Sequence, residues 1–399
     1  MSEWQKVKLG DCISTKKGFA FKSALYTNCG VPVVRVSDFT LDSVADNDLV
    51  YYPHAEKDRY DEYVLNEGDV LIQTVGSWQY NPNSVVGKVV RVPYYHKGSL
   101  LNQNIVKIIP NNGYNNAFIF YRLKCRDFAG HVLGEARGAA NQASITLDTI
   151  KRFSFDCPLL STQQRIATIL SRYDSLIENY QKQIKLLEEA AQRLYKEWFI
   201  DLRFPGHENI KIVDGVPEGW EKKKLIDLVD VQYGYAFDGH LFNSKEEGTP
   251  IVRIRNIPDG YTNDYTTEEA SESYIINDGD ILVGMDGIFH INTWSGGKAF
   301  LVQRACSFRP KDDSMKGFIL QAIYEPIKFF ENTVVGATVA HLGKKHIDSI
   351  ELLVSKNVSL YKPFEKMFNE RQTLKSLLRL LAEARDRLLP KLMSGEITV

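Results

Sequence analysis

The feature that most constrains this chain is an internal repeat, because two parts of its 399 residues carry the same short islands in the same order. A shift of 216 residues places Trp4 on Trp220 and the Gly-Phe-Ala-Phe of 18–21 on the Gly-Tyr-Ala-Phe of 234–237. Slightly different shifts align further islands: 32–36 with 250–254, 66–72 with 277–283, 138–139 with 336–337, and 189–194 with 383–388. A repeat of this kind indicates one architecture built twice, with insertions in the loops between islands.

Each copy is expected to have a mixed front and a helical back, an α+β organisation. In the first front, β-rich runs separated by Gly, Asn and Pro predict strands at 32–36, 70–74, 85–92 and 105–109. The second front repeats the islands that contain the first two of these strands. The sequence therefore predicts two similar globular domains.

The back of the first copy, 162–199, contains no proline or glycine. Its apolar residues follow a 4–3 spacing: Ile166, Leu170, Tyr173, Ile177, Tyr180, Ile184, Leu187, Ala191, Leu194 and Trp198. This spacing predicts a long helix with a coiled-coil seam. We expect Ser161 or Thr162 to cap its start. At 1.5 Å per residue the helix would be about 57 Å long, so it must protrude from its domain or bridge to another.

The back of the second copy repeats the pattern at Leu360, Phe364, Met367, Leu374, Leu378, Leu381, Leu388 and Leu392. Arg371 and Arg385 interrupt this second seam, and Pro390 is expected to terminate or kink its last turn. Antiparallel pairing of the two helices would place one domain at each end of a shared rod, with an approximate two-fold axis. The alternative is two unrelated amphipathic helices, each packed on its own domain.

Several function classes have no support in the sequence. The five cysteines, Cys12, Cys29, Cys125, Cys157 and Cys306, are scattered without a CxxC pair, so neither a disulfide framework nor a zinc ribbon is expected. No run of 18 apolar residues and no signal-peptide pattern at the start is seen, which predicts a cytoplasmic protein with no membrane partner.

Motifs of common enzyme classes are missing from the sequence as well. No GxGxxG follows a strand, no Gly-x-Ser-x-Gly elbow appears, and the eight histidines show no metal-ligand spacing. The glycines of 336–345 are too far apart for a phosphate loop, and Lys345 stands where Ser or Thr should hold magnesium. We expect a chain that is not an enzyme by itself and holds no metal or cofactor of its own.

The polar loops of the two fronts suit recognition of DNA, because Asn and Gln pair with adenine and Arg with guanine in the major groove. The candidates of the first copy are Ser77, Trp78, Gln79, Tyr80, Asn81, Asn102, Gln103, Asn104, Arg137, Asn141 and Gln142. Those of the second copy are His290, Asn292, Trp294, Gln303, Arg304, Thr338, His341, Lys344 and Lys345, with Asp286 beside them. Turn formation is the other reading of any single member. The loops differ between copies while the flanking islands agree, as expected for two readers of different sequences.

Several motifs of the sequence are typical of one known protein family. They are the Trp-x-x-x-x-Leu starts at Trp4 and Trp220, the Gly-Asp-Val/Ile-Leu strands, the helix entry 158–167, the segment 197–206 with 215–220, and the ending 388–397. Together they resemble the specificity subunit of type I restriction–modification systems, over essentially the whole chain. The second helix entry, 357–364, departs from the family pattern.

The resemblance implies four segments: target recognition domain 1 at 1–157, helical spacer 1 at 158–205, target recognition domain 2 at 206–350 and helical spacer 2 at 351–399. Each domain would read half of a bipartite, asymmetric target in double-stranded DNA, and the coiled coil would set the gap. Two methyltransferase subunits with S-adenosylmethionine would assemble on it. Two motor–nuclease subunits that use ATP and magnesium would complete the complex.

Two other functions are compatible with the sequence. The chain could be a single-chain restriction endonuclease with an unrecognised active site, or a coiled-coil scaffold for two sugar- or protein-binding domains. The formal net charge of −1 is low for a protein that binds DNA by neutralising phosphates. The charge is −7 over 207–350, from 15 basic and 22 acidic residues. This charge predicts weak, salt-sensitive DNA binding by the isolated chain and much tighter binding once methyltransferase subunits add their own surfaces.

Overall fold

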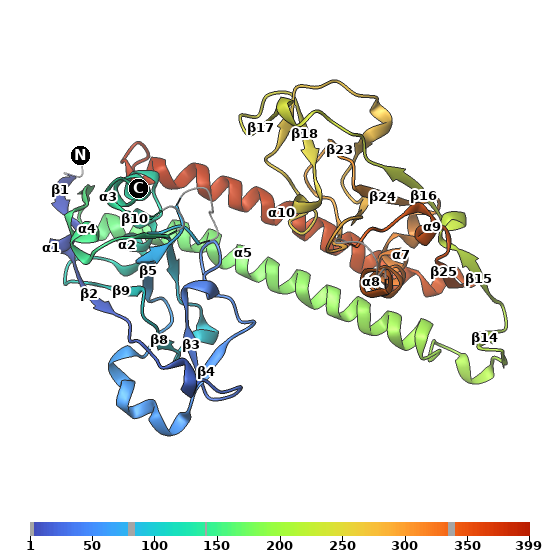
Figure 1. The fold of residues 1–399 in the computed structure, drawn as a ribbon, viewed down its shortest axis with the longest axis horizontal. Coiled ribbons are helices and arrows are strands. Elements are labelled where there is room, and N and C mark those ends of the chain that lie inside the picture. Colours follow the sequence, from blue (N-terminus) through green and yellow to red (C-terminus); the bar gives the residue numbers. More distant parts are fainter. Residues whose placement is uncertain (1–3, 79–83, 140–141, 334–339) are drawn as a thin grey trace. The chain divides into compact units, whose positions relative to one another are not determined.

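The computed structural model describes residues 4–78, 84–139, 142–333 and 340–399. The chain divides into two compact units, one made of Met1–Ser175 with Ala382–Val399 and the other of Leu176–Leu381. Two long helices, α5 (Leu160–Tyr195) and α10 (Lys362–Met393), each begin in one unit and end in the other (Figure 1). Each unit therefore contains one front and one end of both helices.

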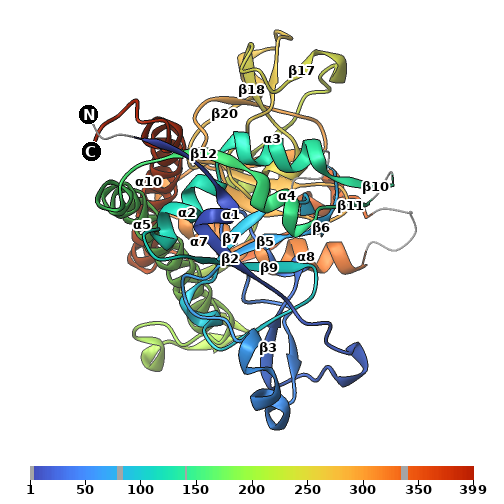
Figure 2. The ribbon, with the colours of Figure 1, turned by 90° about the vertical axis from the view of Figure 1, so that its left-hand side faces the viewer.

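The front of the first unit is built on a four-stranded antiparallel sheet of order β2-β9-β5-β7 (Figure 2). Its strands are β2 (Ile13–Lys17), β9 (Ile105–Pro110), β5 (Val70–Gln73) and β7 (Val89–Arg91). A second sheet joins β4 (Val50–Tyr52), β3 (Val31–Val34) and β8 (Leu100–Leu101), with β3 and β8 parallel. A terminal pair joins β1 (Gln5–Lys8) to β12 (Ser154–Cys157). The helices are α1 (Leu9–Cys12), α2 (Asn116–Leu123), α3 (Arg126–Glu135) and α4 (Leu147–Arg152).

The front of the second unit has the same plan. Its four-stranded sheet is ordered β16 (Val229–Tyr233), β24 (Ala305–Pro310), β21 (Ile281–Gly284) and β22 (Ile291–Thr293). A five-stranded sheet contains β17 (Phe242–Asn243), β19 (Tyr265–Thr266), β18 (Thr249–Val252), β23 (Ala299–Leu301) and β20 (Ile275–Ile276). The pair β15 (Trp220–Lys224) and β25 (Glu351–Ser355) corresponds to β1 and β12. The helices are α6 (Leu225–Leu228), α7 (Lys316–Ala322), α8 (Tyr324–Thr333) and α9 (Lys344–Asp348), and a short hairpin joins β13 (Ile212–Val213) to β14 (Val216–Pro217).

The shared topology confirms the internal repeat and shows what its islands do. In the Asn-x-Gly-Asp islands the aspartate side chain accepts the backbone N–H of the asparagine, Asn66 to Asp69 at 2.7 Å and Asn277 to Asp280 at 3.0 Å. The glycine between them has a positive φ of 82° or 88°, which glycine adopts without the steric cost of a side chain. The same turn therefore delivers the central strand of both sheets. The four strands predicted in the first front are found, with shorter bounds at 31–34 and 89–91.

Burial along α5 and α10 confirms the predicted seams. The predicted seam positions are buried or half-buried in both helices, Ile166, Leu170, Tyr173, Ile177, Tyr180, Ile184, Leu187 and Leu194 in α5 and Leu374, Leu378, Leu381 and Leu388 in α10. Within the second unit, Glu188 meets Arg371 and the Trp198 ring meets that of Phe364, so the segments run antiparallel. Within the first unit, Ile166 shares a hydrophobic core with Leu392 and Met393, and Asp174, further along α5, lies 3.0 Å from Arg385, which precedes them on α10. The helix pair is therefore antiparallel in each unit.

Two details of the helix ends differ from expectation. The first helix begins at Leu160, before the predicted caps Ser161 and Thr162, because the Leu159 carbonyl accepts the N–H groups of Thr162 and Gln163. Pro390 does not terminate α10, which continues to Met393. A proline this close to the end removes one N–H from the ladder, and the Pro390 carbonyl still accepts from the Ser394 N–H at 2.9 Å.

Candidate nucleic-acid interface

In the first unit, three segments that are far apart in the sequence meet at one end of the main sheet. The strand β6 (Val75–Gly76), directly after β5, pairs with β11 (Gln142–Ser144) of a hairpin whose other strand is β10 (Arg137–Ala139). Figure 2 shows these three strands side by side. The third segment, 102–104, joins because the Thr74 N–H donates to the Asn104 carbonyl at 2.8 Å. The Trp78 indole N–H donates to the Ala139 carbonyl at 3.0 Å and ties the first segment to the hairpin.

The second unit brings the equivalent segments together with the counterparts of two first-unit bonds, Thr74 N–H to the Asn104 carbonyl and Ile145 N–H to the Thr74 carbonyl at 2.9 Å. The Met285 N–H donates to the Arg304 carbonyl at 2.8 Å, and the Leu342 N–H donates to the Met285 carbonyl at 2.7 Å. Asp286 and His341 form an isolated antiparallel bridge. The polar loops predicted from the sequence are therefore neighbours in each unit.

The Gly-Phe/Tyr-Ala-Phe islands hold the loops at 102–104 and 302–304 in place. A Cβ atom on Gly18 would lie 1.9 Å from the Asn102 carbonyl oxygen, and one on Gly234 would lie 2.1 Å from that of Val302. In each unit, the residue after the glycine accepts a backbone hydrogen bond from the opposite segment. The Gln103 N–H donates to the Phe19 carbonyl at 2.8 Å, and the Gln303 N–H to the Tyr235 carbonyl at 2.7 Å. Glycine is required here because the two backbones approach too closely for any side chain.

We expect Gly18→Ala and Gly234→Ala each to destabilise the front that contains the substitution by about 3 kcal/mol, because the added methyl group must push two backbone segments apart. Denaturant unfolding of each variant measures this loss. Gly130→Ala is the matched control, since a Cβ on Gly130 meets nothing within 4 Å. Equal stability of Gly18→Ala and Gly130→Ala would contradict the close approach.

In the second unit the meeting point carries a compact charged cluster. His341 Nδ1 lies 2.5 Å from Asp286 Oδ1, and Arg304 Nη1 lies 3.4 Å from Asp286 Oδ2. The His341 and Arg304 side chains keep 47% and 58% of their surface exposed. One carboxylate therefore orients an imidazole and a guanidinium that both remain accessible to a ligand.

The predicted site residues fall into three groups. Exposed or half-exposed beside the meeting points are Asn102, Gln103, Asn104, Arg137, Gln142, His290, Gln303, Arg304, His341, Lys344 and Lys345. Ser77 is buried and Trp78 half-buried, and both contribute to the packing of the first loop. Gln79, Tyr80, Asn81, Asn141 and Thr338 lie outside the described residues.

Trp294 and Asn292 have structural partners. Trp294 is fully buried in a hydrophobic core, and its indole N–H donates to the Gly297 carbonyl at 2.5 Å. The Asn292 amide donates to the Ile257 and Pro258 carbonyls, and its Oδ1 accepts from Arg371 at 2.8 Å and Lys375 at 3.1 Å. We therefore leave both residues out of the proposed DNA-reading set. Asn292 joins the second recognition front to helix α10.

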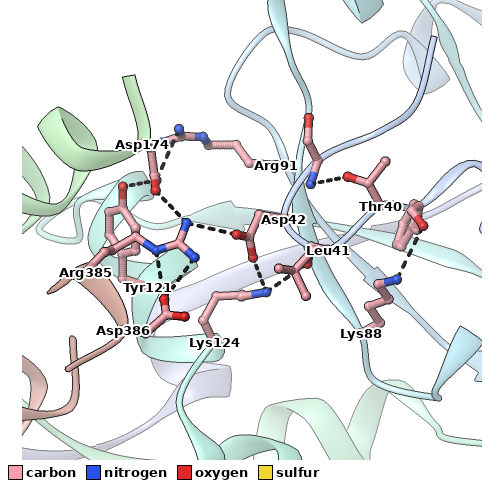
Figure 3. Close-up of polar contacts among 12 residues, drawn as sticks. Thr40, Leu41, Asp42, Lys88, Arg91, Tyr121, Lys124, Asp174, Arg385 and Asp386 are labelled. Carbon is pink, nitrogen blue, oxygen red and sulfur yellow. Dashed lines mark hydrogen bonds and ion pairs between the residues drawn. The ribbon is translucent and has the colours of Figure 1, made fainter. Parts of the chain in front are cut away.

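The two arginines on the seam of α10 make the corresponding connections. In the second unit, the buried Arg371 donates to Glu188 of α5 at 2.6 Å and to Thr293 Oγ1 at 2.6 Å. In the first unit, Arg385 Nη1 donates to Asp174 of α5 at 3.0 Å and to Asp42 of the recognition front at 2.9 Å (Figure 3). Each arginine therefore fills a seam position, pairs with the neighbouring helix and anchors a front.

The Arg385 network of the first unit is extensive (Figure 3). Lys124 lies 2.5 Å from Asp42, and the Tyr121 hydroxyl donates to Asp174, which also lies 3.6 Å from Arg91. Burial alone would raise the pKa of Asp42, but Lys124 and Arg385 outweigh it and hold that pKa below its ordinary value. Asp42 is therefore a carboxylate in a partly buried ion network.

Lys375 gives the second unit a pH-dependent stability. Burial, reinforced by the nearby Arg371, lowers the pKa of Lys375 to about 7. Between about pH 7 and the ordinary lysine pKa, the unfolded chain binds a proton that the folded chain does not. This group therefore makes folding more favourable as pH rises, by at most about 1.4 kcal/mol per pH unit. Denaturant unfolding at pH 7, 8 and 9 should show a steeper rise for the native chain than for Lys375→Met. Parallel profiles would contradict the buried position.

Two features are absent from the described residues. No group of three or more His, Cys, Asp or Glu side chains suitable for a metal ion occurs in the part of the chain that the structure describes. Within the same described ranges, no helix is long and apolar enough to cross a membrane.

The chain is similar to known proteins in sequence and in fold. The family described as "Type I restriction modification DNA specificity domain" matches residues 1–189 and 217–354. The Type I restriction enzyme MjaIX specificity subunit of Methanocaldococcus jannaschii is 28% identical over 319 residues, 75% of this chain and 73% of the relative. The HindI specificity subunit of Haemophilus influenzae is 21% identical over 100% of both chains. A crystal structure of a type I restriction–modification S subunit from M. genitalium, 16% identical, covers 98% of this chain with a TM-score of 0.58 and shows the same fold.

Proposed function

We propose that this chain, which belongs to the type I restriction modification DNA specificity family, is the subunit that reads the DNA target of a type I restriction–modification enzyme. The observation that carries the proposal is the convergence of three divergent polar loops in each unit, on equivalent hydrogen bonds. Each front then reads one half of a bipartite, asymmetric target. The proposed contacts are the exposed and half-exposed candidates Asn102, Gln103, Asn104, Arg137, Gln142, Gln303, Arg304, His341, Lys344 and Lys345.

The proposed recognition domains are 1–157 and 206–350, and the proposed spacers are 158–205 and 351–399. The spacers set the distance between half-sites, as protein geometry sets half-site spacing in other DNA-binding proteins. The two seam arginines support this role, because the side chains of Arg385 and Arg371 each form hydrogen bonds both to α5 and to the front of their own unit.

The chemistry is proposed to reside in partner subunits. Two methyltransferase subunits that carry S-adenosylmethionine would methylate adenine, which requires a flipped base. Two motor–nuclease subunits that use ATP and magnesium would cut unmethylated DNA. The chain itself is proposed to be non-catalytic and to act in the cytoplasm, where these partners and the DNA are present.

Binding and cleavage experiments test this division of labour. The isolated chain should bind its target weakly and in a salt-sensitive way, because its second recognition domain carries a charge of −7 from 15 basic and 22 acidic residues over 207–350. Addition of methyltransferase subunits should tighten binding and produce methylation at a split motif. Tight binding by the lone chain at physiological salt would refute the charge argument. Cleavage of plasmid DNA by the lone chain with magnesium would instead indicate a single-chain endonuclease.

A further inference from the structure

The two units share an unusual backbone conformation at one pair of equivalent positions. Asn104 has a φ of 67° and Arg304 has a φ of 71°, both in the left-handed region that residues other than glycine seldom adopt. Asn104 follows β8, which runs parallel to β3, and Arg304 follows β23, which runs parallel to β18. Each accepts a backbone hydrogen bond of 2.8 Å through its carbonyl, from Thr74 or Met285. Strained positions of this kind persist where the surroundings enforce them and are concentrated at functional sites.

The backbone around this position is the same in both units, but the side chains differ. The tripeptides are Asn-Gln-Asn at 102–104 and Val-Gln-Arg at 302–304. The central glutamine is common to both and cannot distinguish two half-sites. The third position changes from asparagine to arginine on a backbone that the Gly18 and Gly234 contacts hold rigidly on the other side.

Both side chains are available for a ligand. The Arg304 side chain is 58% exposed, and its ion pair with Asp286 at 3.4 Å leaves other guanidinium N–H groups without a partner in the described residues. Among those residues, no hydrogen bond uses the Asn104 amide, which is half-exposed. Asp286 is held by His341 at 2.5 Å and restricts the orientation of the guanidinium.

We propose that this position selects a purine in each half-site: Arg304 reads a guanine and Asn104 reads an adenine, each from the major groove. Arginine donates two parallel hydrogen bonds to O6 and N7 of guanine, and asparagine forms a bidentate pair with N6 and N7 of adenine. Asp286 is a positioning residue for Arg304. The inference rests on the proposed function and adds the identity of one base to each half-site.

The test uses the complex of the full chain with its methyltransferase subunits and DNA carrying the methylated motif. Each guanine of the second half-site is replaced in turn with 7-deazaguanine, which lacks the N7 acceptor. At the guanine that Arg304 contacts, the replacement should weaken binding by about tenfold or more. Arg304→Lys keeps the charge but lacks the planar fork. It should weaken binding to normal DNA, and the 7-deazaguanine penalty should become smaller, because the single ammonium group of lysine spans O6 and N7 less well than the guanidinium does.

Arg255→Lys is the matched control, since Arg255 is also an exposed, ion-paired arginine of the second unit, 62% exposed beside Asp264. It should leave binding and the 7-deazaguanine penalty unchanged. In the first unit, Asn104→Asp tolerates the same backbone but loses the amide donor, so it should remove the penalty for 7-deazaadenine. Asn112→Asp, at an exposed turn residue after β9, is the control and should leave that penalty unchanged.

The inference is overturned if no guanine in the second half-site responds to 7-deazaguanine in the native complex, a measurement that needs no variant. It is equally overturned if Arg304→Lys binds and methylates like the native chain. Both results would leave the proposed function intact, provided that the native complex methylates a split motif. Absence of any split motif would remove the proposed function as well.

Discussion

Replacement of Arg385 by leucine is expected to lower the free energy of unfolding of the first unit by about 3–5 kcal/mol, the usual cost of breaking a partly buried ion network on one side. The Arg385 side chain is 13% exposed and Asp174 is 9% exposed, so water replaces the lost partner poorly. The variant would leave two carboxylates, Asp42 and Asp174, short of a counter-charge in a network that Lys124 and Arg91 only partly neutralise.

Chemical denaturation of the full chain, followed by a probe in the first unit, measures this loss. Arg387→Leu is the matched control, two residues away on the same helix. Its side chain is 78% exposed, and its ion-pair partner among the described residues is Glu383 at 2.6 Å on the helix surface, so its loss should cost less than about 1 kcal/mol. Similar losses for the two variants would show that Arg385 does not anchor the recognition front.

Insertion of one heptad into each long helix is expected to lengthen the DNA spacer by about three base pairs. Seven residues add about 10.5 Å to a helix, and B-DNA rises 3.4 Å per base pair. The insertions belong after residue 181 in α5 and after residue 378 in α10. Asp174 and Glu188 are 14 residues apart on α5, as Arg371 and Arg385 are on α10. Both ion pairs would thus survive, with the seam phase intact.

Methylome sequencing of cells that express the lengthened chain with its methyltransferase subunits measures the outcome. Both half-sites should be unchanged while the number of unspecified bases between them grows. A two-residue insertion in each helix serves as control, because it rotates the seam by about half a turn and should abolish methylation. An unchanged spacer in the heptad variant would refute the role of the helix pair as a ruler.

The repeat, the strands of the first front and both helical seams were predictable from the sequence, because each depends on periodic or repeated residue types. The role of Arg371 and Arg385 was not. Each occupies a seam position where apolar residues are expected, and its partners Glu188 and Asp174 are 183 and 211 residues away. A charged residue on an otherwise apolar seam was the available signal, since such residues are retained only with partners.

In the recognition loops, the sequence predicted more exposed DNA-reading residues than the structure supports. Asn292 and Trp294 have residue types that suit DNA recognition, but they flank the buried Thr293 at the end of β22. The Asn292 side chain is hydrogen-bonded to Arg371 of α10, and the Trp294 indole N–H is hydrogen-bonded to the Gly297 carbonyl. Position relative to the strand, rather than residue type, decides which loop residues face outward. The sequence pattern alone does not give that position.

The central claim is that each unit reads its own half of a split DNA target. Replacement of residues 1–157 by the corresponding domain of a relative with a known target, followed by methylome sequencing, tests it most directly. The account predicts that one half-site changes to that of the relative while the other half-site stays as in the native complex. A change in both half-sites, or in neither, would contradict it.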